Sequence, residues 1–591
     1  MSQETKPDRL GIGLSGGGLR ASFFHIGVLA QMAELNLLRH VEVISTVSGG
    51  SIIGALYYLH VKELLERKAD TDITDQDYVE IVRKIESDFL KATENNIRMA
   101  TFASFVANIK MMFFNFASSD RIGELYNEWL YQSVLRGVNN PLQMRELKIQ
   151  PKAGQENFHP NKHNSDRKAK VPILELNATS LNTGHSWQFS AQRMGEPPTP
   201  YENEIDRKPM RLRRAGGYSD ITPHQQDFPL GHAVAASACV PGLFDPMAVS
   251  ELYRDLELNK YIRVQLVDGG VYDNQGIAAL LRNDCTCFVI SDASGQMGTE
   301  NSPGTGPISV LLRASSVLQD RVRIEGLLHL MDSYGKDNVA YMNLRAGLQV
   351  REIHWIDQHN KQDADDIIPP TSSQDFGVDP RVQESLSKIR TDLDAFTEVE
   401  AYSLMLDGYR MSKNNLEKFK FTADCMHIER AGTARTAPTE PWKFQSIEPW
   451  INNPTPDYLR QLEIAQSTFG KALKCCPWLW AVLVAFLSAV IYIFWSQLAE
   501  LLSSSISVAA IVVFVVVFVV IAVAHWLISA FTPKWAIFLF HPPARWGKAI
   551  FICVIGTVFI KFYQLFINPL YIAHGRLDKL KKPEHDGAAR N

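Results

Sequence analysis

Apolar and polar positions alternate at the start of the chain in a pattern that predicts strands and helices in turn. Arg9–Ser15 is a short apolar run and Val41–Val47 is rich in β-branched residues, so both are expected to be strands. Leu19–Leu38 and Gly49–Leu65 repeat their apolar residues with helical spacing. A strand–helix–strand–helix order is typical of an α/β fold with a mainly parallel sheet.

The same patterning continues further along the chain. It predicts strands at Pro172–Leu181, Ser186–Ala191, Tyr261–Val267 and Thr286–Ser291, and helices over much of 75–136, 308–346 and 378–416. Residues 97–117 are rich in Phe and Met. A core helix packed on the sheet is favoured for them over a lid or a helix that dips into lipid.

Three long apolar segments follow near the C-terminus. Trp478–Trp495 and Ile506–Phe531 contain no charged residue, and each is long enough to cross a hydrocarbon core of about 30 Å. Ala549–Ile572 is interrupted by Lys561, Gln564, Asn568 and Pro569, and a re-entrant or interfacial segment is favoured there over a third span. We therefore expect a catalytic domain with helical additions over 1–425, a proline-containing linker over 426–477, a membrane region over 478–575 with spans at about 478–497 and 506–531, and a basic polar tail over 576–591.

The distribution of basic residues predicts the orientation of these spans. Arg460, Lys471 and Lys474 precede the first span, while Ser496–Ser505 between the spans has no Lys or Arg. The tail again carries basic residues, at Arg576, Lys579, Lys581 and Lys582. By the positive-inside rule, the catalytic domain and the tail are both expected on the cytoplasmic side.

Composition excludes several function classes. The net charge of −4 lacks the basic excess of a nucleic-acid-binding protein. The seven cysteines are scattered without the spacing of a zinc site or a disulfide framework, so no metal or cofactor is expected. The polar N-terminal residues contain no apolar signal core, which favours a cytosolic location for the catalytic part.

A glycine run lies between the first strand and the first helix. Gly16, Gly17 and Gly18 would bring backbone N–H groups to a helix N-terminus, where negative charge is stabilised. Such a loop suits an oxyanion hole or a phosphate group, although a plain tight turn would need the same residues. The run lacks the endings of a P-loop and of a dinucleotide-binding fold.

Two further residues complete a candidate active site. Ser48, in Thr46-Val-Ser-Gly-Gly50, follows a strand and precedes a helix, as in a nucleophile elbow, and the N–H of Gly49 would face an oxyanion. A helix cap is the simpler role for this serine. Asp268 ends an apolar strand before two glycines, at the edge of an α/β sheet where active sites form, although turn aspartates are common.

Together, these motifs resemble the patatin-like phospholipases over roughly residues 8–300. The resemblance includes Gly16–Arg20, the elbow and Asp268–Gly270, and it extends to Asn177–Gly184 and Ala235–Pro246. The departure is Thr46, where the family has glycine. The resemblance implies a three-layer sandwich with a mainly parallel sheet and a Ser48–Asp268 dyad without histidine. It also implies an oxyanion hole from Gly16, Gly17, Gly18 and Gly49.

The resemblance predicts a lipid acyl hydrolase that cleaves acyl esters through an acyl-serine intermediate. Acyl transfer by the same intermediate, and a non-catalytic lipid- or partner-binding protein, are the alternatives. Arg20 could orient the glycine loop, bind a lipid phosphate or cap its helix. A conventional triad would instead require His25, His185 or His232 beside Ser48.

Overall fold

The computed structural model divides into two compact units. The main unit comprises Met1–Thr101, Ala117–Thr468 and Ile572–Asn591, and the second unit comprises Phe102–Phe116 and Phe469–Tyr571. The described residues are 8–481, except 114–115, 135–140, 199–211, 213, 296, 349–375, 423–435, 437 and 469, together with 484–485, 488, 492 and 560–583.

Five parallel strands form the centre of the main unit. They are arranged in the order β10-β9-β1-β2-β3, with bounds β1 (Leu10–Leu14), β2 (Val41–Val47), β3 (Ile173–Ser180), β9 (Cys287–Asp292) and β10 (Val339–Asn343). Nearly all of their residues are buried, as expected for a parallel sheet covered on both faces. The predicted α/β fold with a mainly parallel sheet is confirmed for this part of the sheet. β10 lies within 308–346, where the sequence pattern predicted helix only.

Antiparallel strands extend the sheet beyond β3. These are β4 (Ser186–Phe189), β5 (Arg193–Gly195), β6 (Gly216–Gly217), β7 (Met247–Asp255) and β8 (Lys260–Asp268). β4 and β8 both pair with β3, and β7 forms a hairpin with β8. β7 was not predicted, because its exposed and buried positions do not alternate cleanly along the strand.

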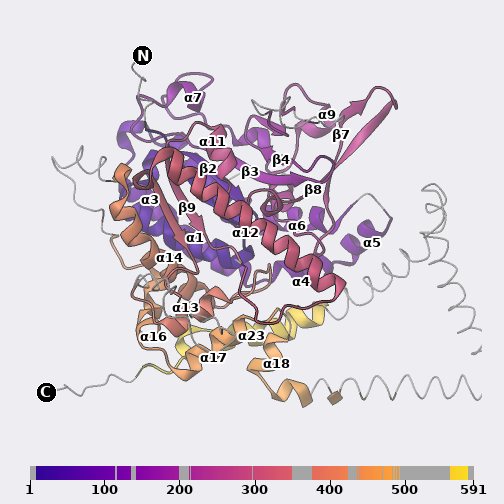
Figure 1. Ribbon diagram of the computed structural model, residues 1–591, viewed down its shortest axis with the longest axis vertical. Coiled ribbons are helices and arrows are strands. Elements are labelled where there is room, and N and C mark those ends of the chain that lie inside the picture. The colour runs from indigo at the N-terminus through magenta and orange to yellow at the C-terminus, as the bar shows by residue number, and fades with distance from the viewer. Residues whose placement is uncertain are drawn as a thin grey trace, which may run out of the picture. The chain divides into compact units, whose positions relative to one another are not determined.

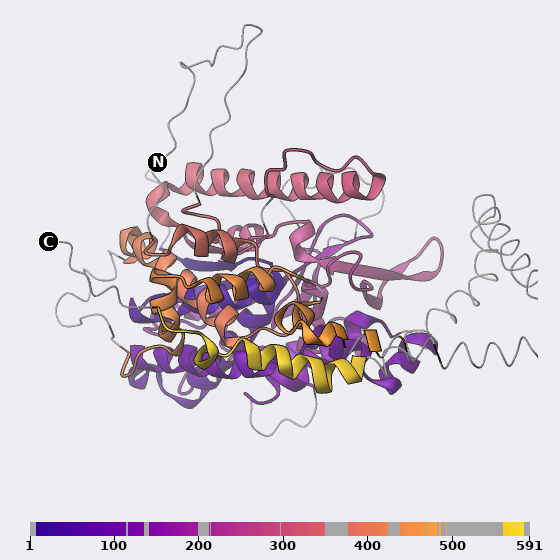
Figure 2. The ribbon, with the colours of Figure 1, turned by 90° about the horizontal axis from the view of Figure 1, so that it is seen from below.

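Helices cover both faces of the sheet, which gives three layers (Figures 1 and 2). One face carries α1 (Gly18–Glu34), α2 (Gly49–Arg67), α3 (Asp75–Thr93) and α14 (Glu398–Lys418), and the other carries α11 (Ile277–Arg282) and α12 (Pro307–Tyr334). Neighbouring residues Val43 and Ile44 belong to different core clusters, as the pleat of β2 requires. The other helices named below are α4 (Ile97–Phe102), α5 (Phe105–Phe113), α6 (Ser118–Tyr126), α7 (Pro160–His163), α9 (Pro223–Gln226), α10 (Leu230–Ser237) and α13 (Pro380–Ser387).

The segment predicted to be a linker is partly folded into the core. Within 426–477 the structure contains α16 (Glu448–Asn452), α17 (Pro456–Ala465) and α18 (Lys471–Cys475). Pro449 and Pro456 stand in the first turns of α16 and α17, where a proline costs no hydrogen bond. The linker prediction was wrong for these residues, because prolines that begin helices were interpreted as loop markers.

The Phe- and Met-rich segment 97–117 is not a core helix of the sheet. It divides into α4 and α5, and α5 belongs to the second unit, where Phe105 and Val106 are 56% and 64% exposed. The favoured prediction of a core helix was therefore wrong for α5. Burial requires a partner surface that periodicity alone does not reveal.

The predicted membrane spans fall largely outside the described residues. Ile506–Phe531 is not described, nor is most of Trp478–Trp495 and Ala549–Ile572. Within the described part of the chain, no helix is both long and apolar enough to cross a bilayer. The described end of the third segment is helical and includes α23 (Asn568–His574), and the Lys471 ammonium lies 4.3 Å from the centre of the Tyr571 ring.

The residues after α23 pack on the main unit. Val399 N–H donates to the Gly575 carbonyl (3.1 Å), and Leu577 N–H donates to the Glu398 carboxylate (3.0 Å). Further along, the Trp450 indole N–H donates to the Lys581 carbonyl (2.8 Å). The start of the basic tail is thus part of the same folded body as the sheet.

Candidate active site

Ser48 occupies a strained turn between β2 and α2. Its φ of 51° and ψ of −117° lie in a region that residues other than glycine rarely adopt. A Cβ on Gly49 would lie 2.0 Å from the Gly18 carbonyl oxygen, so the turn packs its backbone directly against the glycine loop. The geometry is that of a nucleophile elbow, and it costs about 1–3 kcal/mol, which the surrounding packing must offset.

Thr46 stands at the elbow position where the patatin-like pattern has glycine, and Gly54 makes room for it. A Cβ on Gly54 of α2 would lie 2.5 Å from the Thr46 methyl carbon. The Thr46 hydroxyl pairs with the Ser51 hydroxyl (2.9 Å), so the side chain is satisfied in a fully buried place. The glycine absent from strand position 46 is therefore replaced by a glycine on the helix, because Gly54 leaves room for the Thr46 methyl group.

Asp268 reaches Ser48 through an antiparallel strand. Asp268 at the end of β8 pairs with Ala178 of β3, one residue beyond the Val47–Asn177 pair that precedes Ser48. The Ser48 hydroxyl is close enough to the Asp268 carboxylate to lower the pKa of that carboxylate through hydrogen bonding. Asp268 was expected at the end of a strand on the active-site edge of the sheet; β8 is in fact antiparallel to β3, and its last three residues pair with Ala178–Ser180 at the C-terminal end of β3.

The Asp268 carboxylate is a stronger base than an ordinary aspartate. Burial raises its pKa from 3.8 to about 6, against the lowering effect of hydrogen bonds from the Ser48 hydroxyl and from Gly270 N–H, the latter at 2.7 Å. A pKa near the working pH suits a general base.

A single segment at the end of α10 holds both members of the pair. The Ser237 hydroxyl oxygen accepts the Ser48 backbone N–H (3.1 Å) and donates to the Asn177 carbonyl (2.6 Å). Two residues later, the Cys239 carbonyl accepts the Asp268 backbone N–H (2.9 Å). The sequence pattern indicates no role for these residues beyond their place in the stretch Ala235–Pro246.

The glycine loop offers fewer free donors than the sequence suggested. Gly16 N–H donates to the Asn274 carbonyl (3.1 Å), and a Cβ on Gly16 would lie 3.1 Å from the Ser48 Cβ. Among the described residues, no acceptor is found for the N–H groups of Gly17, Gly18 and Gly49. Gly16 therefore shapes the loop, and the other three N–H groups remain available to an oxyanion.

Arg20 is buried under the glycine loop. Its guanidinium donates to the carbonyls of Ile389 (2.7 Å) and Ala293 (2.9 Å), and burial lowers its pKa to about 10. With 3% of the residue exposed, it cannot serve as a surface helix cap. Of the roles considered for Arg20, these contacts support that of orienting the loop.

The candidate histidines are engaged elsewhere. His25 is buried between the Ser291 hydroxyl (2.7 Å) and the Ser15 carbonyl (2.9 Å), and burial lowers its pKa to about 4. His232 lies 3.8 Å from the Asp120 carboxylate, and His185 belongs to the hairpin between β3 and β4. The Asp268 carboxylate, by contrast, interacts with the Ser48 side chain.

Residues 13–281 match the model of the patatin-like phospholipases. No curated protein is detectably similar to the chain in sequence. The match covers a little under half of the chain and marks residues 13–281 as similar to a patatin-like phospholipase domain.

Among solved structures, the chain is similar to human GIVD cytosolic phospholipase A2 in complex with methyl γ-linolenyl fluorophosphonate inhibitor and terbium chloride, at 14% identity and a TM-score of 0.35. That similarity covers 72% of this chain and 60% of the human chain, so this protein spans less than two thirds of that enzyme's length. It is also similar to VipD from Legionella pneumophila, at 12% identity and a TM-score of 0.24, over 78% of this chain and 83% of VipD.

Proposed function

We propose that this protein hydrolyses acyl esters of membrane lipids, with Ser48 as nucleophile and Asp268 as general base. The observation that carries the proposal is the Ser48 side chain, held on a strained elbow beside a buried carboxylate whose pKa is raised to about 6. A structural helix cap would need neither the strain nor the perturbed carboxylate.

The reaction has two halves. The Ser48 oxygen attacks the ester carbonyl carbon while its proton moves to Asp268, and the negative oxygen that forms is stabilised by the N–H groups of Gly17, Gly18 and Gly49. The intermediate collapses to an acyl-serine, and the departing alcohol takes the proton from Asp268. A water molecule then loses its proton to Asp268 and attacks the acyl-serine, which releases the fatty acid and restores Ser48.

Product analysis with defined phospholipids tests the proposal. Purified wild type is expected to release fatty acid and lysophospholipid, and a fluorophosphonate probe is expected to label it. Ser48→Ala is expected to fold normally, to lose at least about 1,000-fold in kcat, and to resist the probe. Normal turnover by Ser48→Ala would contradict the assignment.

The same experiment separates the alternatives. Acyl chains that appear on an added lipid alcohol rather than as free fatty acid would indicate acyl transfer, because the acyl-serine is common to both reactions. Lipid binding by wild type without turnover or labelling would instead indicate a non-catalytic protein.

We further propose that the catalytic domain is held on the cytoplasmic face of a membrane, with residues 478–497 and 506–531 as spans. The length and lack of charge of these segments support this arrangement. In the second unit, large apolar side chains are exposed at the start of the first of these segments (Trp478, Trp480) and in the third apolar segment (Leu565, Phe566), as suits residues that meet lipid. A bilayer location would explain how the active site meets a water-insoluble substrate.

A further inference from the structure

The loop between α13 and α14, Lys388–Thr397, is mostly buried although it has no regular secondary structure, and Lys388 and Thr391 are its exposed residues. We call it the strap. Ile389, Arg390 and Leu393 are each at most 5% exposed, and Asp394 is 1% exposed. Connecting loops normally run over the surface, where water satisfies their polar groups. A buried loop with charged residues must instead be held by specific partners.

The strap is bonded to the glycine loop of the active site. Leu19 N–H donates to the Asp392 carbonyl (3.0 Å), and the Arg20 guanidinium donates to the Ile389 carbonyl (2.7 Å). A Cβ on Gly18 would lie 2.7 Å from the Asp392 backbone nitrogen. The strap therefore packs directly against Gly18, Leu19 and Arg20, next to the free N–H groups of Gly17 and Gly18.

The strap is also bonded to the residues just before the C-terminal apolar segments. The Arg390 guanidinium donates to the Ala465 carbonyl (2.7 Å) and pairs with the carboxylates of Asp394 and Glu400. Arg98 pairs with the Asp392 carboxylate and also donates to the Thr468 carbonyl (3.1 Å). Thr468 is the last residue of the main unit before the chain enters the second unit.

The returning chain is anchored where the strap ends. The strap runs into the first turn of α14, and there Val399 N–H and the Glu398 carboxylate bond Gly575 and Leu577. The strap and the first turn of α14 therefore contact three parts of the chain: the glycine loop, the residues where the chain leaves the main unit, and the residues where it returns.

We propose that the strap positions the glycine loop for catalysis and ties it to the points where the chain leaves and re-enters the main unit, with Arg98 as the positioning residue. Arg98 touches no reacting atom, so it acts through Asp392 and Leu19. This inference rests on the proposed acyl hydrolase activity, and it adds that anchoring of the apolar segments in a bilayer sets the shape of the oxyanion site.

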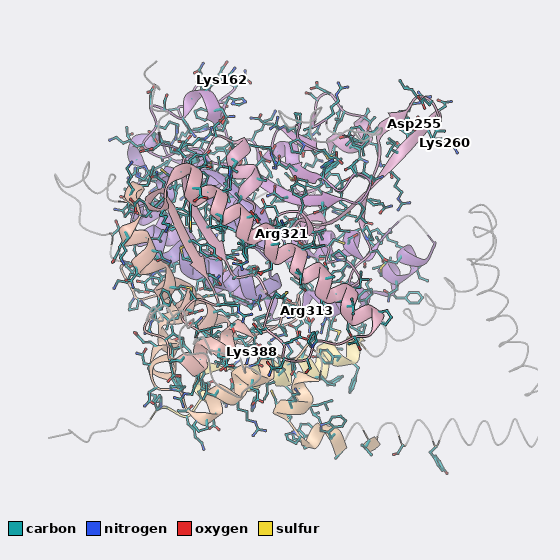
Figure 3. All side chains as sticks on the ribbon, in the orientation of Figure 1. Lys162, Asp255, Lys260, Arg313, Arg321 and Lys388 are labelled. Carbon is teal, nitrogen blue, oxygen red and sulfur yellow. The ribbon has the colours of Figure 1, made fainter. Side chains whose placement is uncertain are left out.

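Arg98 is a better test than Arg390. The Arg390 side chain is 1% exposed, and its loss would strand two buried carboxylates and endanger folding. The Arg98 side chain is 17% exposed. Arg98→Gln removes the ion pair with Asp392, whereas Arg98→Lys keeps the charge but loses the fork that reaches Asp392 and Thr468 together. The matched control is Lys388→Gln, in the same loop (Figure 3). The Lys388 side chain is 55% exposed and pairs with the Glu384 carboxylate.

The experiment uses the full chain in phosphatidylcholine vesicles and in detergent, with a water-soluble short-chain ester as substrate. Arg98→Gln is expected to lower kcat by about 10- to 100-fold with KM changed by less than about two-fold, because substrate binding is untouched while oxyanion stabilisation is weakened. Labelling of Ser48 by a fluorophosphonate should slow by the same factor. Arg98→Lys should fall in between, and Lys388→Gln should match wild type.

The comparison of the two environments tests the tie to the apolar segments. Wild type is expected to have a higher kcat in vesicles than in detergent, and Arg98→Gln is expected to lose that difference. A kcat for Arg98→Gln equal to that of wild type, or a change confined to KM, would overturn the proposal. If Arg98→Gln does not fold, the same criteria apply to Arg98→Lys. Inactivity of wild type itself would refute the proposed function instead.

Discussion

At the scale of single residues, the site is governed by the cost of burying the Asp268 carboxylate. Burial favours its protonated form, and hydrogen bonding to the Ser48 hydroxyl and to Gly270 N–H opposes that effect. A dyad without histidine needs this raised pKa, because an ordinary carboxylate holds a proton too weakly to draw one from serine. The same burial makes the charged form a source of instability.

The first prediction at this scale is a pH dependence. Only ionised Asp268 can accept the serine proton, so kcat/KM of wild type should fall with unit slope below about pH 6, where the pKa now lies. Initial rates with a soluble ester across pH 4.5–8, a range of about ±2 units around that pKa, would measure it. His185→Gln and His232→Gln should leave the profile unchanged, and a midpoint that moved with either histidine would argue for a triad.

Stability should change with pH in the opposite sense. Because the folded pKa is raised, the folded protein binds a proton between the ordinary pKa of 3.8 and about 6 that the unfolded chain does not bind. Stability from this group is therefore present at low pH and is lost as pH rises through about 6. Asp268→Asn should be inactive but more stable than wild type by about 1–3 kcal/mol at pH 8, with the difference vanishing near pH 4 in thermal unfolding. Equal stabilities at pH 8 would contradict the raised pKa.

At the scale of elements, the elbow depends on how closely α2 approaches β2. The approach is limited by the Thr46 methyl group, and Gly54 provides the space that it occupies. The elbow motif in this chain is therefore shared between a strand residue, Thr46, and a helix residue eight positions later, Gly54. Thr46 is therefore compatible with the elbow, because Gly54 packs against it without a side chain.

Gly54→Ala is expected to destabilise the domain by about 1–3 kcal/mol, because the added methyl would lie 2.5 Å from the Thr46 methyl carbon. The same substitution in a Thr46→Gly background should cost less, with a coupling of about 0.5–3 kcal/mol in a double-mutant cycle of denaturant unfolding. Additive effects of the two substitutions would mean that Gly54 does not compensate for Thr46.

At the scale of the whole molecule, the contacts of the basic tail constrain any membrane arrangement. Gly575, Leu577 and Lys581 bond residues of the same folded body that carries the sheet. A chain that leaves this body after Thr468 and rejoins it at Ile572 must end on the side where it began. Any crossings between these points are therefore even in number, which agrees with two spans and a third segment that does not cross.

Cysteine labelling in intact cells measures this arrangement. A cysteine at Glu584 is expected to resist an impermeant thiol reagent, and one at Ser504, between the two proposed spans, is expected to react. Both should react after the cells are made permeable, which controls for accessibility. Strong labelling at Glu584 in intact cells would restore three spans and would require the tail contacts to be absent.

The sequence by itself determined the parallel start of the sheet, the elbow at Ser48 and the candidate base at Asp268, because periodicity, glycine turns and short motifs are local properties. Only the tertiary structure decided how these parts meet. Asp268 lies at the end of the antiparallel strand β8, and hydrogen bonds from Ser48 N–H to Ser237 and from Asp268 N–H to Cys239 hold these two residues. The Gly16 N–H donates to the Asn274 carbonyl and is not available to a ligand.

The tertiary structure also decided which segments are buried. Pro449 and Pro456 begin packed helices, α5 exposes Phe105 and Val106, and the strap joins residues far apart in the chain. Burial and long-range hydrogen bonds depend on the segment and equally on the surface that it packs against. The sequence pattern of a segment describes the segment itself but not that partner surface.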